Sequence, residues 1–127
     1  MKISCIQMDM RLGEVDYNFA HAEKLIRSTV AAEGSDVVVL PETWNTGFFP
    51  RENLTALCDR DSQQVKARIG GLAKKYGVNI VAGSVSNYHD GKLYNTCCVF
   101  DRQGALIASY DKIHLFTHVG EDKRYNK

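Results

Sequence analysis

The segment 37–44, with the sequence VVVLPETW, places four apolar residues directly before a proline and a glutamate. A short continuous apolar run, as in DVVVL (36–40), is typical of a strand that is covered on both of its faces. In an open α/β sheet, ligands collect at the carboxyl ends of the strands. The segment therefore predicts a buried strand with Glu42 at the end where ligands bind.

The segments around this strand alternate between strand and helix patterns. Residues 2–10 alternate with a period near two and predict a first strand. Residues 18–32 predict a helix, with Asn18 as its N-cap and Gly34 as its stop. Its apolar face would consist of residues at helical spacing, namely Ala22, Leu25, Ile26 and Val30.

A second helix is predicted from Asp61 or Ser62 to about Tyr76. Two glycines, Gly70 and Gly71, lie inside it, and each costs about 1 kcal/mol relative to alanine. A close approach of the helix to the sheet would explain this cost. The inner face of the helix would consist of Val65, Ile69, Leu72, Ala73 and Tyr76.

Three strand patterns follow the second helix, at 78–86, 92–100 and 105–116, and turn sequences separate them. The order β-α-β-α-β-β-β predicts an α/β fold with a mixed sheet and two helices on one face. The strands at 36–40 and 79–83 are apolar on both sides. The other face of the sheet therefore also needs cover, which a second half of the domain or a second subunit would provide.

Composition excludes several classes of function. The chain has 127 residues, which suggests one domain, and its formal net charge of +1 predicts no binding to nucleic acid or to a membrane surface. No apolar run approaches the length of a membrane span, and the N-terminus does not resemble a signal peptide. The spacing of the cysteines fits neither metal-binding pairs nor a disulfide scaffold, which predicts reduced thiols in a cytoplasmic protein. These cysteines are Cys5, Cys58, Cys97 and Cys98.

Three charged residues lie at or beyond the ends of predicted strands: Glu42, Lys112 and Glu121. An acid and a lysine that meet at such a place would shift each other's pKa and could transfer protons. Each residue also has an ordinary interpretation. Glu42 and Glu121 could be solvated loop acids, and Lys112 could be an edge-strand residue that opposes aggregation. From the residues alone, a packed histidine is a better interpretation of His114 than a base or a ligand.

The sequence offers no pattern for a metal or a cofactor. His89, His114 and His118 have no cysteine or histidine partner at the spacing of metal ligands. The chain contains neither a G-x-G-x-x-G fingerprint nor a Walker loop. We therefore predict that it binds no metal and no cofactor.

The segments 37–50 (VVVLPETWNTGFFP) and 110–116 (YDKIHLF) together resemble the nitrilase superfamily of carbon–nitrogen hydrolases. Residues 2–26 resemble the first strand and helix of that family, and residues 77–116 resemble the strands that follow. The resemblance implies that residues 1–127 are the N-terminal portion of a single carbon–nitrogen hydrolase domain. The fold would then be half of a nitrilase-type α-β-β-α sandwich.

The resemblance also implies hydrolysis of a small linear amide by a Glu-Lys-Cys triad. Glu42 matches the general base, Lys112 matches the lysine that stabilises the tetrahedral intermediate, and Glu121 resembles a second glutamate that orients the lysine and the substrate. His114, in the lysine motif, is a candidate for contact with the substrate. Aromatic residues that follow Glu42 could line a closed pocket or could belong to the core, namely Trp44, Phe48 and Phe49.

One departure from the family concerns the nucleophile. The family's catalytic cysteine lies on a strand beyond the lysine, and residues 1–127 are expected to end before that strand. None of the four cysteines stands in its place, and we interpret all four as small apolar residues. The sequence therefore predicts that this polypeptide alone has no amidase activity.

Two further interpretations remain open at this stage. The chain could be a non-catalytic module that persists as a binding or assembly unit, with the same fold and no turnover. A flavodoxin-like binding domain is disfavoured, because three consecutive strands end the pattern. Within the resembled family, residues 111–125 look most like the ω-amidase type, which hydrolyses amides of small dicarboxylic or 2-oxo acids. The uncovered sheet face predicts a homo-oligomer.

Overall fold

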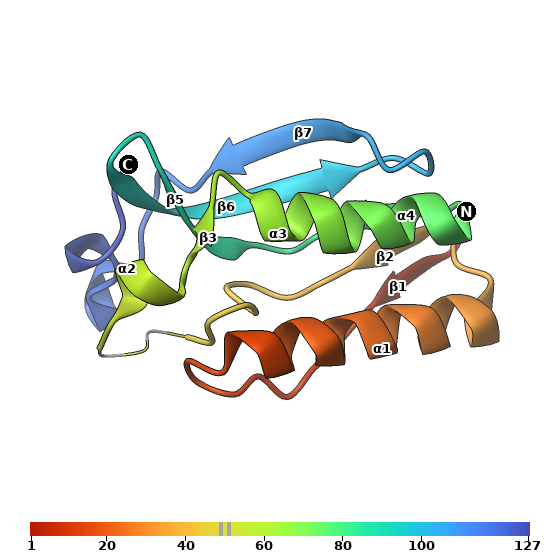
Figure 1. The fold of residues 1–127 in the computed structure, drawn as a ribbon, viewed down its shortest axis with the longest axis horizontal. Helices are drawn as coiled ribbons and strands as arrows, with labels where there is room; N and C mark the ends of the chain where they lie inside the picture. Colours follow the sequence, from red (N-terminus) through yellow and green to blue (C-terminus); the bar gives the residue numbers. More distant parts are fainter. Residues whose placement is uncertain (49, 51) are drawn as a thin grey trace.

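The computed structural model describes residues 1–127 except Phe49 and Arg51, and it contains one mixed seven-stranded sheet (Figure 1). β1, β2 and β4 are parallel neighbours, and β4 pairs antiparallel with β6. β5 and β7 also pair antiparallel with β6, and β3 runs parallel to β5. The strands are β1 (Ile3–Cys5), β2 (Val37–Val39), β3 (Asp59–Arg60), β4 (Asn79–Val81), β5 (Val85–His89), β6 (Lys92–Phe100) and β7 (Leu106–Asp111).

Helix α1 (Val15–Glu33) and a composite helix lie on the same side of the sheet. The composite helix joins α3 (Gln63–Val65), a π-helical segment (Lys66–Gly70) and α4 (Gly71–Tyr76). The other helices are short: α2 (Leu54–Leu57) and the 3-10 turns Thr117–Val119 and Glu121–Lys123. In the described part of the chain, no helix is long and apolar enough to cross a membrane. The predicted α/β class, mixed sheet and helix-covered face are confirmed.

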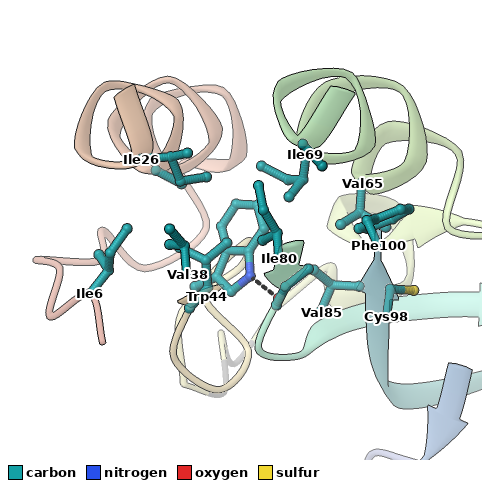
Figure 2. Close-up of a cluster of buried hydrophobic side chains, with 14 of the residues drawn as sticks. Ile6, Ile26, Val38, Trp44, Val65, Ile69, Ile80, Val85, Cys98 and Phe100 are labelled. Atoms are coloured by element: carbon teal, nitrogen blue, oxygen red, sulfur yellow. Dashed lines mark hydrogen bonds between the residues drawn. The ribbon is translucent and has the colours of Figure 1, made fainter. Parts of the chain in front are cut away.

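The hydrophobic core lies between the helices and this face of the sheet. Figure 2 shows Ile26 of α1 and Ile69 of the composite helix above Val38 and Ile80 of the strands. All four side chains have no exposed surface. Burying one such side chain stabilises the fold by roughly 1.5–3 kcal/mol. The apolar run that ends before Glu42 therefore fixes β2 against the helices, between β1 and β4.

The opposite face of the sheet carries apolar side chains that none of the described helices covers. One row in register crosses five neighbouring strands and consists of Cys5, Val39, Val81, Val99 and Ala108. These five residues are partly or fully exposed, and we call the face that they define the open face. The sequence predicted that this face would need cover.

The predicted strand at 78–86 is two strands in the structure, β4 and β5, and Gly83 lies between them. Gly83 has a φ of +56°, and an added Cβ would lie 1.9 Å from Pro41 O. The expectation of one continuous strand was wrong because the chain bends here to make room for the turn after β2. The strand pair β3–β5 was also not predicted, since β3 contains only two residues.

Asn18 is not the N-cap of α1. The helix begins at Val15, and Asn18 lies inside it with no exposed surface. Its side chain accepts a hydrogen bond from Arg11 N at 2.8 Å and donates to Arg11 O at 2.7 Å and Asn45 O at 3.1 Å. Asn18 thus joins two loops to the helix. The predicted stop at Gly34 is confirmed by its left-handed conformation.

The structure explains one of the two glycines in the second helix. An added Cβ at Gly70 would lie 3.1 Å from the Phe100 ring and 3.3 Å from Gly104 O. The expected close approach of helix and sheet is therefore confirmed at Gly70. Gly71 faces open space, and nothing in the structure explains its presence.

Candidate active site

Glu42 lies in the turn after β2, and the segment between β4 and β5 fixes this turn. Thr43 N donates to Ser84 Oγ at 3.0 Å. Trp44 N donates to Ser84 O at 3.3 Å, and Ser84 N donates to Pro41 O at 3.1 Å. Thr43 has a φ of +46°, which is rare for a β-branched residue. This strained turn, held by three hydrogen bonds, sets the position of the Glu42 side chain.

Lys112 and Asn95 lie side by side at the end of the β6–β7 hairpin. Lys112 N donates to Asn95 O at 2.9 Å, which extends the ladder by one position beyond β7. Both side chains reach Glu42: Lys112 Nζ donates to Oε1 at 2.8 Å, and Asn95 Nδ2 donates to the same oxygen at 2.9 Å. Two strand ends that are far apart in sequence therefore meet at one carboxylate oxygen.

Glu121 completes the group from the C-terminal turns. Its side chain has no exposed surface. Its Oε1 accepts a hydrogen bond from Asn95 Nδ2 at 3.0 Å, and its Oε2 accepts from Lys112 Nζ at 2.9 Å and from Phe116 N at 2.6 Å. Every one of these bonds favours the ionised carboxylate. Glu121 thus shares both donors, Lys112 Nζ and Asn95 Nδ2, with Glu42.

The charges in this group stabilise one another. Burial alone would lower the pKa of Lys112, but hydrogen bonds to Glu42 and Glu121 and their negative charges outweigh burial and raise it. Burial alone would raise the pKa of Glu121, but hydrogen bonds from Phe116 N, Asn95 and Lys112 outweigh burial and lower it. At neutral pH Lys112 is therefore a fixed positive charge and Glu121 a fixed negative charge.

Glu42 is the most accessible of the three ionised groups. Its side chain is 46% exposed, compared with 30% for Lys112 and 0% for Glu121. The two hydrogen bonds to Glu42 both use Oε1. Its Oε2 accepts no hydrogen bond from the residues that the structure describes. Glu42 can thus be held in place through one oxygen while the other exchanges a proton with a bound group.

A cavity of about 270 Å³ opens beside these residues on the open face of the sheet. Glu42, Lys112 and Asn95 form its polar wall, and Cys97 lies on the same side of β6 as Asn95. Burial raises the pKa of the Cys97 thiol, so this thiol is less easily ionised than a free cysteine. The remaining wall is mostly apolar and consists of Leu40, Pro41, Gly83, Ser84 and Tyr110.

Residues 2–127 match the sequence model of the carbon-nitrogen hydrolase family. The chain belongs to the carbon–nitrogen hydrolase family. It is 40% identical over 119 residues to a 2-oxoglutaramate amidase of Bacillus subtilis, and 37% identical over 119 residues to an omega-amidase of Danio rerio. The matches cover 94% and 91% of this chain, but only 45% and 40% of those proteins. The chain thus spans less than half the length of the curated relatives it matches.

Solved structures of the family agree with this fold. A CN-hydrolase superfamily protein of Xanthomonas campestris, which carries an arsenic adduct in its active site, matches with a TM-score of 0.83 at 33% identity. That match covers 98% of this chain and 44% of the other. Nit3 of Saccharomyces cerevisiae matches with a TM-score of 0.86 at 21% identity and covers 99% and 48% of the two chains. The sheet and its helices are therefore the nitrilase-superfamily architecture, as the sequence predicted.

The aromatic residues near Glu42 do not all lie where the family resemblance suggested. Trp44 is fully buried in the core, where it packs edge-on against Phe19 at 4.7 Å between ring centroids. Its Nε1 donates to Ala82 O at 2.8 Å (Figure 2). The prediction that Trp44 contacts substrate was wrong, because the reversed turn at Thr43 directs its side chain beneath the sheet.

Two of the other substrate-contact candidates, Phe48 and His114, are not among the residues that line the cavity described above. Phe48 is 46% exposed. His114 is also exposed, in the segment between β7 and the C-terminal turns. Phe49 lies outside the described residues. Contact of Phe48, Phe49 or His114 with a substrate stays a prediction.

Asn95 is the one member of the group that sequence reasoning missed. Inside KLYNTCCVF it resembles any polar residue of a strand. Only the hairpin register places it opposite Lys112, and only the fold brings Glu42 to both. A polar residue opposite the family lysine, on a strand face that otherwise carries Leu93, Cys97 and Val99, is the signal that could have identified it.

The described residues contain no group of three histidine, cysteine, aspartate or glutamate side chains that could hold a metal ion. All four cysteines are free thiols, of which Cys58 and Cys98 are buried. The groups that meet at the site are two carboxylates, one ammonium and one amide.

Proposed function

We propose that this chain supplies Glu42, Lys112 and Glu121 for the hydrolysis of a C–N bond in a small linear amide. The observation that carries the proposal is the contact of Lys112 and Asn95 with both Glu42 Oε1 and the buried Glu121. Membership of the carbon–nitrogen hydrolase family supports it. The nucleophile in this proposal is a cysteine thiol that lies outside residues 1–127.

We assign a distinct role to each group. Glu42 Oε2 takes the proton of the thiol, and the thiolate attacks the amide carbon to form a C–S bond. The Lys112 ammonium stabilises the negative charge that develops on the carbonyl oxygen. Collapse of this intermediate breaks the C–N bond, and Glu42 gives its proton to the departing amine. Glu42 then deprotonates a water molecule, which attacks the thioester, releases the carboxylic acid and restores the thiol.

Glu121 acts through Lys112 in this scheme. Its carboxylate is ionised and buried, so it keeps the ammonium protonated and directed at the carbonyl oxygen. Because Lys112 has a raised pKa, it stays charged throughout and does not compete with Glu42 as the base. Asn95 holds both carboxylates at a fixed separation through one amide group.

The cavity favours a small substrate with a short carbon chain. Its volume of about 270 Å³ fits a molecule of a few carbon atoms, and its wall beyond the charged groups is mostly apolar. We propose an ω-amidase type of substrate, the monoamide of a small dicarboxylic or 2-oxo acid. Similarity to the 2-oxoglutaramate amidase of Bacillus subtilis and to the omega-amidase of Danio rerio supports this class.

The test uses a chimera in which residues 1–127 replace the matching segment of the Bacillus subtilis relative. We expect the chimera to release ammonia from a small dicarboxylic monoamide. Lys112→Met should lower kcat by on the order of a hundredfold to a thousandfold, because it removes the charge that stabilises the oxyanion. Lys92→Met, at an exposed lysine that begins β6, is the matched control. Equal activity of the two variants would contradict the role of Lys112.

The 127-residue chain alone provides a second test. We expect no ammonia release from it. Turnover by the purified chain that Glu42→Gln leaves unchanged would contradict both the missing nucleophile and the assignment of the base. Turnover that Cys97→Ala abolishes would instead make Cys97 the nucleophile, since this thiol lines the same cavity.

A further inference from the structure

A second polar cluster lies on the other face of the β6–β7 hairpin, directly behind the candidate active site. At its centre, Asp111 Oδ1 accepts a hydrogen bond from Thr96 Oγ1 at 2.6 Å, and Asp111 Oδ2 lies 3.0 Å from His89 Nε2. Asn87 Nδ2 donates to Thr96 Oγ1 at 3.3 Å. The His89 ring stacks on Tyr94 with 4.2 Å between ring centroids. We call Asp111, Thr96, His89 and Asn87 the Asp111 cluster.

The strand register places this cluster back to back with the active site. Successive residues of a strand point to opposite faces. Thr96 pairs with Asp111 and faces the cluster, whereas Asn95 and Lys112 form the next pair and face Glu42. Asp111 and Lys112 are consecutive residues, so a fixed Asp111 side chain also fixes the point from which the Lys112 side chain starts.

The end of β7 needs such support. In the described part of the chain β7 pairs only with β6, and its side chains from Leu106 to Tyr110 are exposed. An edge strand with few buried contacts opens locally at low cost. The Asp111 cluster connects β5, β6 and β7 at the end of β7 where Lys112 follows.

We propose that Asp111 is a positioning residue that, through its hydrogen bonds on the back of the hairpin, sets the place of the Lys112 ammonium in the active site. The proposal rests on the catalytic role proposed for Lys112. It makes the position of Lys112 depend on a residue that lies outside the active site, on the other face of the hairpin. A displacement of about 1 Å at a catalytic group can lower the rate on the order of a hundredfold.

Four variants separate positioning from other effects of Asp111. Asp111→Ala removes the hydrogen bonds and the charge. Asp111→Asn removes the charge but keeps an acceptor for Thr96 and a donor for His89 Nε2. Thr96→Val removes the hydrogen bond from Thr96 Oγ1 to Asp111 and the weaker one from Asn87, and it removes no charge. Asp101→Ala is the matched control, because Asp101 Oδ1 accepts two backbone hydrogen bonds in the turn at the opposite end of the same hairpin.

The readout is the pKa of Lys112 in the 127-residue chain, from NMR titration of the side-chain carbon next to Nζ. The Lys112 signal is the one that Lys112→Met removes. Contact with Glu42 and Glu121 raises this pKa, so a displaced ammonium should titrate closer to an ordinary lysine. We expect this shift in Asp111→Ala and Thr96→Val. Asp111→Asn and Asp101→Ala should titrate like the wild-type chain.

Two results would overturn the proposal. If Asp111→Asn shifts the pKa as much as Asp111→Ala while Thr96→Val does not, the effect comes from the charge of Asp111. If Asp101→Ala produces the same shift, general loosening of the hairpin explains it. Should Asp111→Ala fail to fold, Thr96→Val decides alone, because valine keeps the shape of threonine and an unshifted pKa contradicts the proposal.

The ammonia-release assay of the chimera separates this proposal from the proposed function. Asp111→Ala in the chimera should lower kcat on the order of tenfold to a hundredfold with little change in KM, and Asp111→Asn should recover most of the loss. If the chimera has no activity but Asp111→Ala still shifts the pKa of Lys112, the result would support the positioning role and contradict the proposed function. An active chimera in which Asp111→Ala changes neither kcat nor the pKa of Lys112 would support the proposed function and contradict the positioning role.

Discussion

The two faces of the sheet differ in what they contribute. On the helix-covered face, Val38 and Ile80 have no exposed surface, and they stabilise the fold. On the open face, their direct neighbours Val39 and Val81 are partly exposed. The candidate active site lies at the edge of this open face, where Glu42 and Lys112 meet. The covered face thus supplies rigidity, and the open face presents the chemistry.

This difference explains how a strand can be buried and still end in an accessible acid. Val38 enters the core, and the turn after β2 then carries Glu42 to the other side, where its side chain lines the cavity on the open face. The turn at Thr43 and the bend at Gly83 join the two faces. Predictions about the faces and about these turns therefore test the account most sharply.

The largest effect on stability is expected from a comparison of two adjacent residues that lie on opposite faces of the sheet. Ile80→Ala should lower the free energy of unfolding by about 2–5 kcal/mol, because it leaves a cavity in the core. Val81→Ala, at the adjacent position on the open face, should cost less than about 1 kcal/mol. Chemical denaturation of both variants measures the difference. Equal losses would mean that the open face is packed as tightly as the covered one.

The second-largest effect on stability is expected at the bend at Gly83. Gly83→Ala combines a φ of +56° with a Cβ that would lie 1.9 Å from Pro41 O. Gly91→Ala is a matched control, because Gly91 has a φ of +77° but no atom within 4 Å of the added Cβ. Backbone strain alone should lower the free energy of unfolding by about 1–3 kcal/mol in either variant. Gly83→Ala should lose more than Gly91→Ala, because only its Cβ meets Pro41 O. A Gly83→Ala variant no less stable than Gly91→Ala would show that the turn before Glu42 is not held by this contact.

The stability of the fold should depend on pH through the ionisation of Glu121. Because its pKa is lowered in the folded state, its contribution is present above the ordinary carboxyl pKa and is lost as the pH falls through the lowered value. Glu121→Gln should cost about 1–3 kcal/mol at neutral pH and progressively less in acid. Unfolding measured from pH 7 downward tests this, with exposed Glu52→Gln as the control. A constant difference between Glu121→Gln and the wild-type chain at all pH values would contradict the ion pair.

The smallest effect on stability, but a visible one on assembly, is expected on the open face. We propose that the 127-residue chain self-associates through its uncovered apolar row. Val81→Lys and Val99→Lys should shift the sedimentation profile towards monomer with little loss of stability. A wild-type chain that sediments as a clean monomer and binds no apolar dye would contradict this proposal.

The fold was predictable wherever a pattern is local. The apolar run of β2, the period of α1 and the stop at Gly34 are visible in the sequence and confirmed in the structure. The bend at Gly83 was not predictable, because it depends on Pro41, some forty residues earlier in the chain. The buried role of Asn18 was missed because an asparagine at the start of a helix is usually a cap.

The candidate site was predictable only in part for the same reason. Glu42, Lys112 and Glu121 were identified by resemblance to a family, and the structure brings them together. Asn95 lies in no motif, and Asp111 lies in the segment 110–116 without a role of its own there. Only the hairpin register shows which face each residue serves. Trp44 was misassigned because proximity in sequence to Glu42 does not determine the direction of a side chain after a reversed turn.

The most direct test of the central claim is ammonia release by the chimera with Glu42→Gln, compared with Glu14→Gln, a change at an exposed glutamate that pairs with Arg11. If Glu42 is the general base, Glu42→Gln should lower kcat on the order of a hundredfold to ten-thousandfold, and Glu14→Gln should leave it unchanged. A Glu42→Gln chimera that is folded and retains the kcat of the parent would contradict the account.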